Sequence, residues 1–456
     1  MRRCAGAHVE GWLALALALL VGCGPGRGHE PRPRSVLLII ADDLSFRIGL
    51  YGFAARTPNL QRLAARGRRF DHAYCQYPLC NPSRTSFLTG WRPERTQVWG
   101  NLRAPQAFIQ GATPLQEHFR ASGYFTARVG KVYHSRFEEE FHWDLVVDTY
   151  DEVPEEAPLD EAWGPSGRRD EDEPDGRAAR RTVELLREKR DVPFFIGLGF
   201  LKPHAPWIVP KAYLEMYPPA SLELPPPSPS DRQILGARRG ASSDLPPSKW
   251  REARAAYFAS ATFMDAQLGV VLDAMDRLRL WDRTVVVLMS DNGLHVGEHG
   301  LWGKMTLFEE SSRVPLVIAG AGVERPGEAT PRLAELVDIY PTLLELCRLP
   351  KVEGLAGTSL VPVLQDPDRA TKTAAFTMGK VGAARKVQLA ESVRTERYRY
   401  TEWPDGQVEL YDHERDPYEL RDLAEEPSQR KTVEELKRRL GEHRRVTPVP
   451  SVAPPE

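Results

Sequence analysis

Three apolar runs, each followed at once by polar side chains, constrain the fold of this chain most. The run VLLII is followed by Asp42 and Asp43, PFFIGLGF by His204, and VVVLMS by Asp291 and Asn292. Short continuous runs rich in branched and aromatic residues are typical of strands buried on both faces. Open α/β sheets bind their ligands at the carboxyl ends of such strands. We therefore predict that these polar residues meet at one edge of a sheet.

Helical patterns separate these runs, at residues 57–67, 113–122, 177–189 and 249–278. Alternating strands and helices indicate a parallel sheet with helices on both faces. The predicted fold class is α/β, with a large, mostly parallel sheet flanked by helices. We assign residues 35–370 to this domain.

The pattern changes near residue 371, where short segments such as ESVRTERYRYTEW and GQVELYDHERDP alternate polar and apolar residues. The turn formers Pro404, Asp405 and Gly406 lie between two such segments. We predict a small C-terminal subdomain over residues 371–446, built from an antiparallel sheet and a charged helix at 428–444. The Pro-rich tail at 447–456 is expected to be disordered.

Two stretches look like insertions into the main domain. Residues 148–175 are strongly acidic, and residues 218–247 are rich in Pro and Ser. Their low apolar content makes them poor core material. Either they line the rim of the site and select the substrate, or they are ordinary surface loops.

The N-terminus has the pattern of an export signal. Arg2 and Arg3 precede the apolar run WLALALALLVG, which is too short to span a bilayer comfortably. The run ends at Cys23 in a sequence that resembles a bacterial lipobox. We interpret residues 1–23 as a signal peptide with a lipobox and residues 24–34 as a flexible tether. The protein is then an exported envelope lipoprotein attached to the membrane through a lipid on Cys23; the alternative is a plain signal peptide. No later apolar stretch is expected to span a membrane.

Charge and cysteine content exclude two classes of protein. The 61 basic and 63 acidic residues give a net charge of -2, which argues against a general nucleic-acid binder. Cys4 would leave with the signal peptide, and the few remaining cysteines form no disulfide framework. Whether Cys75 and Cys347 pair is left open, although Cys75 is expected to be buried and inert.

The polar residues after the strands suit a hard cation. Asp42, Asp43 and Asp291 offer carboxylates, and Asn292 offers a carbonyl oxygen. The chain has no Cys or His cluster with zinc spacing. Ligation by oxygen alone favours Ca²⁺, with Mg²⁺ as the alternative.

The run CNPSRTSFLTG begins at Cys80 and has the pattern on which sulfatases oxidise a cysteine to formylglycine. With this run, the chain resembles a type I sulfatase of the alkaline phosphatase superfamily and is most similar to the iduronate-2-sulfatase branch. Other supporting stretches, in the family's order, are LLIIADDL, GYFTARVGKVYH, GFLKPHAPWIVPKAYLEMYP, YFASATFMDAQLGVVLDAMDRL, SDNGLHVGEHGLWGK and SVRTERYRYTEW. They cover nearly all of the chain beyond the signal and imply an alkaline phosphatase-like fold.

The resemblance also implies a role for individual residues. The metal ligands it implies are Asp42, Asp43, Asp291, Asn292 and the formylglycine made from Cys80. The residues it implies for catalysis are Cys80 as nucleophile, Arg84 to steady it, and Lys131, His134, His204 and Lys304 to contact the sulfate. Iduronate-2-sulfatases have histidine at the position that Asn292 occupies in this chain. This difference weakens a strict assignment to iduronate-2-sulfatases. We interpret His295 and His299 as supports of their loop and leave them outside this set.

The implied function is an exported sulfatase that acts on sulfated sugars, such as 2-O-sulfated uronic acid units, after a formylglycine-generating enzyme has converted Cys80. In the implied mechanism a hydroxyl of the hydrated aldehyde attacks sulfur. His204 or Lys304 then protonates the leaving alcohol, and His134 takes the proton of the second hydroxyl. Two alternatives are a phosphodiester or phosphonate ester hydrolase of the same superfamily and a non-catalytic surface protein that binds glycans.

Overall fold

The three predicted strands are neighbours in the middle of an eight-stranded sheet. The protein is described here from a computed structural model that covers residues 33–134, 137, 141–150, 163–226, 245–381 and 387–447. The sheet, in spatial order, consists of β12 (Ala329–Glu335), β2 (Gly67–Tyr74), β11 (Arg313–Gly320), β8 (Thr284–Ser290), β1 (Ser35–Asp42), β6 (Phe194–Pro203), β3 (Phe125–Gly130) and β4 (Leu145–Val147).

The sheet is mostly parallel, as predicted. β1 pairs in parallel with β8 and β6, and only β11 runs against its two neighbours. The carboxyl ends of β8, β1 and β6 therefore lie at the same edge. β2 and β11 were not predicted as strands.

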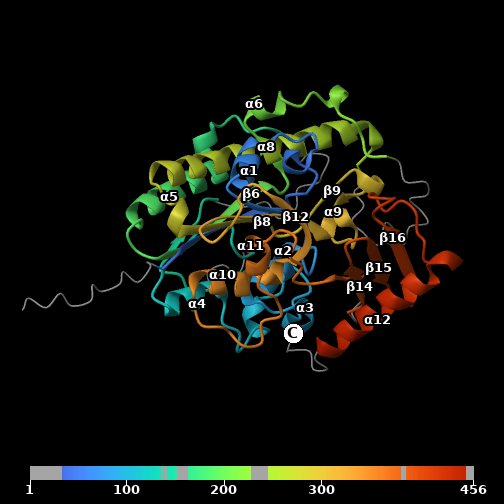
Figure 1. Ribbon diagram of the computed structural model, residues 1–456. Coiled ribbons are helices and arrows are strands. Elements are labelled where there is room, and N and C mark those ends of the chain that lie inside the picture. Colours follow the sequence, from blue (N-terminus) through green and yellow to red (C-terminus); the bar gives the residue numbers. More distant parts are fainter. Residues whose placement is uncertain are drawn as a thin grey trace, which may run out of the picture. The chain divides into compact units, whose positions relative to one another are not determined.

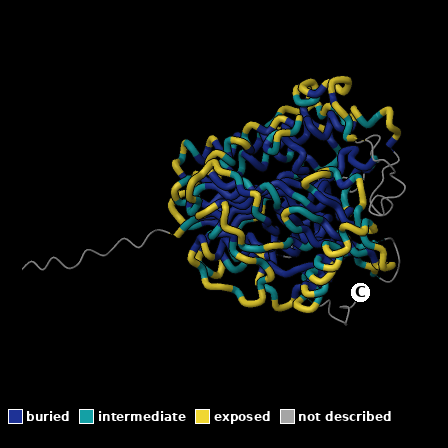
Figure 2. Tube along the Cα trace, turned by 45° about the vertical axis from the view of Figure 1, so that its right-hand side comes forward, coloured by how far each residue is buried: buried dark blue, intermediate teal, exposed yellow. Residues whose placement is uncertain are grey.

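The alternating side chains of β1 enter two separate cores. Leu37 and Ile39 belong to the core on one face, whereas Leu38 and Ile40 belong to the core on the other. The first face is covered by α1 (Pro58–Ala64), α5 (Pro174–Glu188) and α8 (Trp250–Arg277). The second face is covered by α2 (Cys80–Thr89), α4 (Leu115–Ala121), α10 (Ile339–Cys347) and α11 (Val361–Gln365). Figure 1 shows these helices on opposite sides of the strands, and Figure 2 shows the buried chain between them.

The four helices predicted in this domain are present, with ends that differ by a few residues. α5 begins at Pro174, three residues before the predicted start, because proline suits the first turn of a helix. One stretch, Pro247–Arg277, is long and apolar enough to cross a membrane, contrary to our expectation. However, 89% of its apolar window is buried inside the protein, so it is a core helix.

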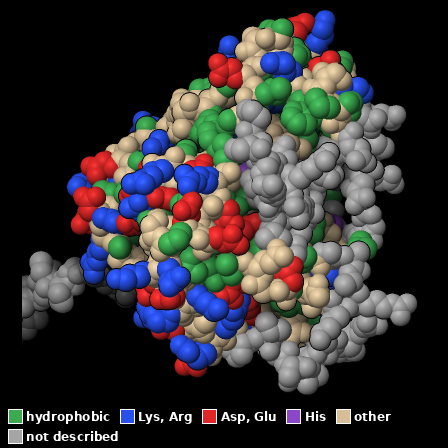
Figure 3. Space-filling model, turned by 90° about the vertical axis from the view of Figure 1, so that its right-hand side faces the viewer, with side chains coloured by type: hydrophobic (Ala, Val, Ile, Leu, Met, Phe, Trp, Pro, Cys, Tyr) green, Lys and Arg blue, Asp and Glu red, His purple; other side chains and the backbone are tan. Residues whose placement is uncertain are grey.

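The C-terminal region forms the predicted antiparallel sheet. Its strands, in order, are β13 (Ala375–Lys380), β14 (Leu389–Arg394), β15 (Tyr398–Glu402) and β16 (Val408–Asp412). The predicted turn joins β15 to β16, and the charged helix α12 (Arg430–Val446) packs its Leu436 and Leu440 against the sheet. Figure 3 shows basic and acidic side chains intermixed on one face of the molecule, in keeping with the near-zero net charge.

The remaining elements are short. They are α3 (Pro93–Thr96), α6 (Lys211–Leu214), α9 (Glu309–Ser312) and two small sheets, β10 (Trp302–Gly303) with β9 (His295–Val296) and β5 (Trp163–Pro165) with β7 (Trp207–Val209). The predicted signal peptide and lipobox, the tether up to residue 32 and the tail from residue 448 lie outside the described residues. Parts of both insertions, 151–162 and 227–244, lie outside them too. The domain boundaries stay predictions.

Candidate active site

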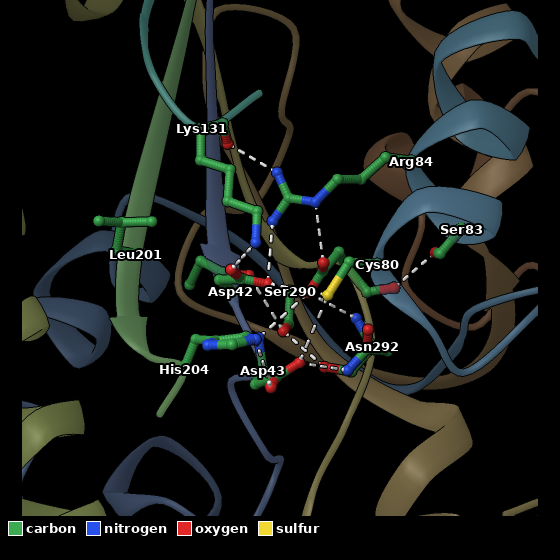
Figure 4. Close-up of polar contacts among 12 residues, drawn as sticks. Asp42, Asp43, Cys80, Ser83, Arg84, Lys131, Leu201, His204, Ser290 and Asn292 are labelled. Atoms are coloured by element: carbon green, nitrogen blue, oxygen red, sulfur yellow. Dashed lines mark hydrogen bonds and ion pairs between the residues drawn. The ribbon is translucent and has the colours of Figure 1, made fainter. Parts of the chain in front are cut away.

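The carboxyl ends of three adjacent strands bring the predicted metal ligands together (Figure 4). Asp42 ends β1, Asp291 follows β8, and His204 follows β6. Asp43 adopts a left-handed backbone conformation with φ of 62°, which turns the chain sharply at the end of β1. The Tyr257 hydroxyl donates to the Asp43 carbonyl at 2.9 Å and so holds this turn. The sheet topology and one tyrosine from α8 therefore fix the position of the carboxylates.

α2 places Cys80 and Arg84 one turn apart on the same face of the helix. The fully buried Arg84 guanidinium lies between two carboxylates, with Nε 2.8 Å from Asp291 Oδ2 and Nη2 3.2 Å from Asp42 Oδ1. Its Nη1 donates to the Lys131 carbonyl at 2.6 Å. Arg84 therefore fixes Asp42, Asp291 and the chain after β3, and its role in steadying the converted nucleophile stays a prediction.

The Cys80 thiol lies between carboxylates and an ammonium group. Its Sγ is 3.4 Å from Asp42 Oδ1 and 2.8 Å from Lys304 Nζ. Burial raises the pKa of this thiol well above its usual value, and Asp42 raises it further, while Lys304 opposes the rise. An unmodified Cys80 is thus held as a neutral thiol, which is a poor nucleophile. In a converted protein, Sγ would mark the place of the formylglycine oxygen.

Two lysines balance the carboxylates. Lys131 forms an ion pair with Asp42, and Lys304 Nζ lies 2.5 Å from Asp43 Oδ1. Burial opposes protonation of both lysines, but the carboxylates outweigh it and raise the pKa of each ammonium. Both lysines therefore stay charged at neutral pH and present fixed positive charge beside Cys80.

The two histidines flank this cluster. His204 Nε2 lies 3.8 Å from Asp43 Oδ2, and Nδ1 lies 2.6 Å from the Ala205 carbonyl, a contact that assigns the proton to Nδ1. Burial lowers the pKa of His204. Burial and the nearby Lys131 charge lower the pKa of His134 to about 3, and His134 Nδ1 is buried with no hydrogen-bond partner among the described residues. His134 is therefore a neutral base at pH 7.

The donor set fits a hard divalent cation. One carboxylate oxygen from each of Asp42, Asp43 and Asp291 lies within 4.8 Å of the other two, and all three side chains are buried. Burial raises the pKa of Asp291 to about 6; Arg84 opposes the rise and the other two carboxylates add to it. Asn292 Nδ2 donates to Asp43 Oδ1 at 2.7 Å, but Asn292 Oδ1 is buried without a partner in the described part of the chain. A cation would satisfy that oxygen and relieve the repulsion.

Some supporting residues were missed by sequence reasoning. Asp175 accepts hydrogen bonds from the backbone of Leu201 at 2.7 Å and Lys202 at 2.9 Å, and so holds the chain just before His204. It lies at the end of the acidic stretch considered poor core material, yet it is buried. Ser83 Oγ donates to the Asp291 carbonyl at 2.5 Å. A single carboxylate within an acidic run gives no sequence signal that distinguishes it from its neighbours.

The residues left out of the prediction lie apart from the carboxylates. His295 Nε2 contacts Thr306 Oγ1 at 2.7 Å, and the His299 ring stacks on Phe308.

Cys75 and Cys347 are both buried, and neither forms a disulfide. Their thiols contact the carbonyls of different segments, so the open question of pairing is answered in the negative.

Comparisons with known proteins agree with this geometry. The sulfatase family profile matches residues 34–349, and the profile described as N-sulphoglucosamine sulphohydrolase, C-terminal, matches residues 297–446. A sulfatase of Formosa agariphila is 32% identical over 441 residues, covering 88% of this chain and 85% of the relative. A choline-sulfatase of Rhizobium meliloti is 29% identical, covering 86% and 83%. The iduronate 2-sulfatase of Mus musculus is 29% identical, covering 74% of each chain.

Among solved structures, the phosphonate monoester hydrolase of Agrobacterium radiobacter is similar with a TM-score of 0.78 at 22% identity. The likeness covers 91% of this chain and 96% of that chain. At this identity it supports the fold alone. The match of the sulfatase profile to more than half of the chain confirms the resemblance drawn from the motifs: this protein belongs to the type I sulfatase family.

Proposed function

We propose that this sulfatase hydrolyses sulfate esters of carbohydrates, with 2-O-sulfated uronic acid units as the favoured substrate, through a formylglycine made from Cys80. The observation that carries this proposal is the contact of Cys80 with Lys304 beside three buried carboxylates. An iduronate 2-sulfatase among the relatives supports a sugar substrate. Asn292 argues against activity restricted to iduronate, because iduronate-2-sulfatases have histidine at this position.

The proposed reaction is R–O–SO₃⁻ + H₂O → R–OH + HSO₄⁻. Asp42, Asp43, Asp291 and Asn292 would hold a Ca²⁺ or Mg²⁺ ion. Together, the ion and the hydrated formylglycine supply a deprotonated hydroxyl nucleophile at neutral pH. The chain's own residues do the rest.

Lys131 and Lys304 place two ammonium groups where the negative oxygens of the sulfate collect, and fixed charge in a buried site stabilises a developing anion. The ester S–O bond breaks, and the alcohol oxygen takes a proton from Lys304 Nζ or from His204 Nε2 when that ring is in its imidazolium form. His134, neutral and with no partner at Nδ1 among the described residues, accepts a proton as sulfate leaves. Arg84 keeps Asp42 and Asp291 in place during these transfers.

The test combines two measurements on one preparation. Mass spectrometry of the Cys80 peptide measures the formylglycine fraction, and ion chromatography measures sulfate released from a panel of sulfated sugars. Release from at least one sugar, lost in Cys80→Ala, supports the proposal. Fully converted protein that releases no sulfate from any sugar contradicts it.

Two other functions remain alternatives. The likeness to a phosphonate monoester hydrolase favours testing a phosphonate or phosphodiester ester. Higher kcat/KM on an aryl phosphonate than on an aryl sulfate would favour that alternative. A non-catalytic glycan-binding protein is disfavoured because the charged candidates converge at Cys80.

We also propose that the protein is exported and anchored through a lipid on Cys23. The support is the charged and apolar N-terminal sequence. Mass spectrometry of the mature N-terminus tests this proposal, because an unmodified N-terminus at another residue would contradict it.

A further inference from the structure

A pocket of about 580 Å³ lies beside the active site. The end of β6, the start of α5 and Phe263 of α8 contribute to its wall. Its volume falls within the range of about 300–1,000 Å³ that is typical of ligand sites. Of the groups assigned above to the reaction or to the metal, only His204 lines this pocket, while the supporting Asp175 lies in its wall. It is therefore a separate compartment with one shared wall.

His204 separates the pocket from the active site. Its ring lines the pocket, and its Nε2 lies 3.8 Å from Asp43 Oδ2 in the carboxylate cluster. Figure 4 shows Leu201, which also lines the pocket, and His204 on the side of Asp42 that faces away from Arg84 and Ser83. If His204 protonates the leaving alcohol, the pocket lies on the side toward which that alcohol departs.

The pocket wall has an excess of positive charge. It contains three cationic side chains, Arg168, Arg177 and Lys202, and two carboxylates, Glu173 and Asp175. Both oxygens of Asp175 are occupied by backbone N–H groups of β6. The exposed Arg168 side chain has no carboxylate partner among the described residues, so it is available to an anion.

Other wall groups suit a sugar ring. Glu173 Oε1 is buried with no hydrogen-bond partner in the described segments, and Glu173 is only 5% exposed. A buried acceptor of this kind needs a donor, such as a sugar hydroxyl. Phe263 and Ile208 offer apolar surface for the C–H face of a pyranose. The wall thus combines an acceptor, an apolar face and the guanidinium of Arg168, which has no carboxylate partner among the described residues.

We propose that this pocket binds an anionic sugar unit on the alcohol side of the ester, with Arg168 as the residue that recognises its oxyanion. This inference rests on the proposed function and specifies its substrate class. The shared chemistry is an oxyanion on a sugar ring, from either a uronate carboxylate or a second sulfate group. A guanidinium binds both groups through paired hydrogen bonds.

The experiment is calorimetric binding of a hyaluronan tetrasaccharide, which carries carboxylates but no sulfate, to the full chain. We expect binding that weakens about tenfold when the probe is carboxyl-reduced and about tenfold in Arg168→Gln. The matched control is Arg169→Gln, because the neighbouring Arg169 pairs with Glu171 and Asp172 and does not line the pocket. That variant should bind the probe like the wild type.

A second experiment measures the binding of a carboxyl-reduced, 6-O-sulfated tetrasaccharide, which carries sulfate but no carboxylate. It compares the Cys80→Ala variant with the double variant that also carries Arg168→Gln. Loss of affinity through Arg168→Gln for the first probe assigns a uronate, and loss for the second probe alone assigns a sulfate. The proposal is overturned if Arg168→Gln leaves the affinity for both probes unchanged, whether it is made in the wild type or in Cys80→Ala. It is also overturned if Arg169→Gln weakens binding as much as Arg168→Gln does. Neither arm measures turnover, so its failure is distinct from a failure of the proposed sulfatase reaction.

Discussion

Lys304 Nζ lies 2.8 Å from Cys80 Sγ and, at the same time, 2.5 Å from Asp43 Oδ1. One ammonium group thus touches both the position of the nucleophile and a candidate metal ligand. Its contact partners raise the pKa of Lys304 well above the usual value despite burial. Lys304 is therefore positively charged at neutral pH beside the candidate nucleophile.

Replacing Lys304 tests this contact. Lys304→Ala should lower kcat by about 10²–10³-fold, because a fixed positive charge that stabilises a developing anion is lost. The matched control is Lys211→Ala, since Lys211 is exposed and forms an ion pair with the exposed Glu215 on the surface. Steady-state kinetics on any sugar that the enzyme hydrolyses checks both variants. A Lys304→Ala enzyme with wild-type kcat would remove this residue from the reaction.

The carboxylate cluster predicts a metal content. Asp291→Asn keeps the side-chain shape but removes one negative charge, so the bound divalent ion should fall at least about tenfold in affinity. Elemental analysis after dialysis measures the ion directly, without an activity assay. Asp273→Asn is the control, because Asp273 of α8 is exposed and forms an ion pair with Arg62 of α1. Unchanged metal content in Asp291→Asn would show that the ion lies elsewhere.

A buried ion-pair network joins the C-terminal sheet to the active-site loop. Arg399 of β15 contacts Glu309 of α9 and Glu419, each at 2.6 Å. The neighbouring Ser311 carbonyl accepts the backbone N–H of Gly293, next to Asn292. The C-terminal sheet therefore supports the segment that carries a candidate metal ligand.

Arg399→Gln should lower the free energy of unfolding by about 3 kcal/mol, because it removes the guanidinium that two buried carboxylates share and leaves Glu309 with Arg394 and Glu419 with His413. Arg421→Gln is the control, since the side chains of Arg421 and its partner Glu426 are both exposed and the variant should unfold nearly like the wild type. Urea unfolding followed by circular dichroism compares the two. Equal stability of both variants would mean that the network adds nothing to the fold.

The same network predicts a loss of stability in acid. Burial opposes ionisation of Glu419, but Arg399 and His413 outweigh it and lower its pKa from 4.5 to about 2. The folded state therefore binds this proton less tightly than the unfolded state. The stability that Glu419 contributes is complete above about pH 4.5 and is lost as the pH falls from 4.5 toward 2.

Glu419→Gln should thus be less stable than the wild type at pH 7 and should lose less stability between pH 5 and pH 3. Free energies of unfolding at several pH values measure the difference between the two proteins. Glu414→Gln, at an exposed position beside Arg397, is the control. Parallel curves for Glu419→Gln and the wild type would contradict the lowered pKa.

The sequence predicted the centre of the fold better than its edges. β1, β6 and β8 are short apolar runs rich in branched and aromatic residues, a pattern that favours strands buried on both faces. β2 was missed because its sequence, GRRFDHAY, is full of charged residues. Arg68 is nevertheless accommodated in this buried strand, because its guanidinium donates hydrogen bonds to the backbone carbonyls of Glu324 and Glu328.

The same contrast holds in the site. The candidates that follow strands could be predicted because the carboxyl ends of parallel strands meet at one edge of the sheet, and those of the Cys80 motif because the motif itself is specific. Tyr257 and Asp175 could not, since their roles depend on contacts with Asp43 and with the end of β6, far along the chain. Likewise, the contacts of Arg84 with Asp42 and Asp291 join segments that are far apart in the chain, so the sequence did not predict them.

The central claim is that an aldehyde made from Cys80 performs the hydrolysis. The most direct measurement prepares several batches that differ in formylglycine fraction and determines, for each, the rate of sulfate release from the best sulfated sugar. The account predicts a rate proportional to the formylglycine fraction, with none from protein that keeps Cys80 as a thiol. A rate independent of that fraction, or no release from fully converted protein that holds its metal ion, would contradict it.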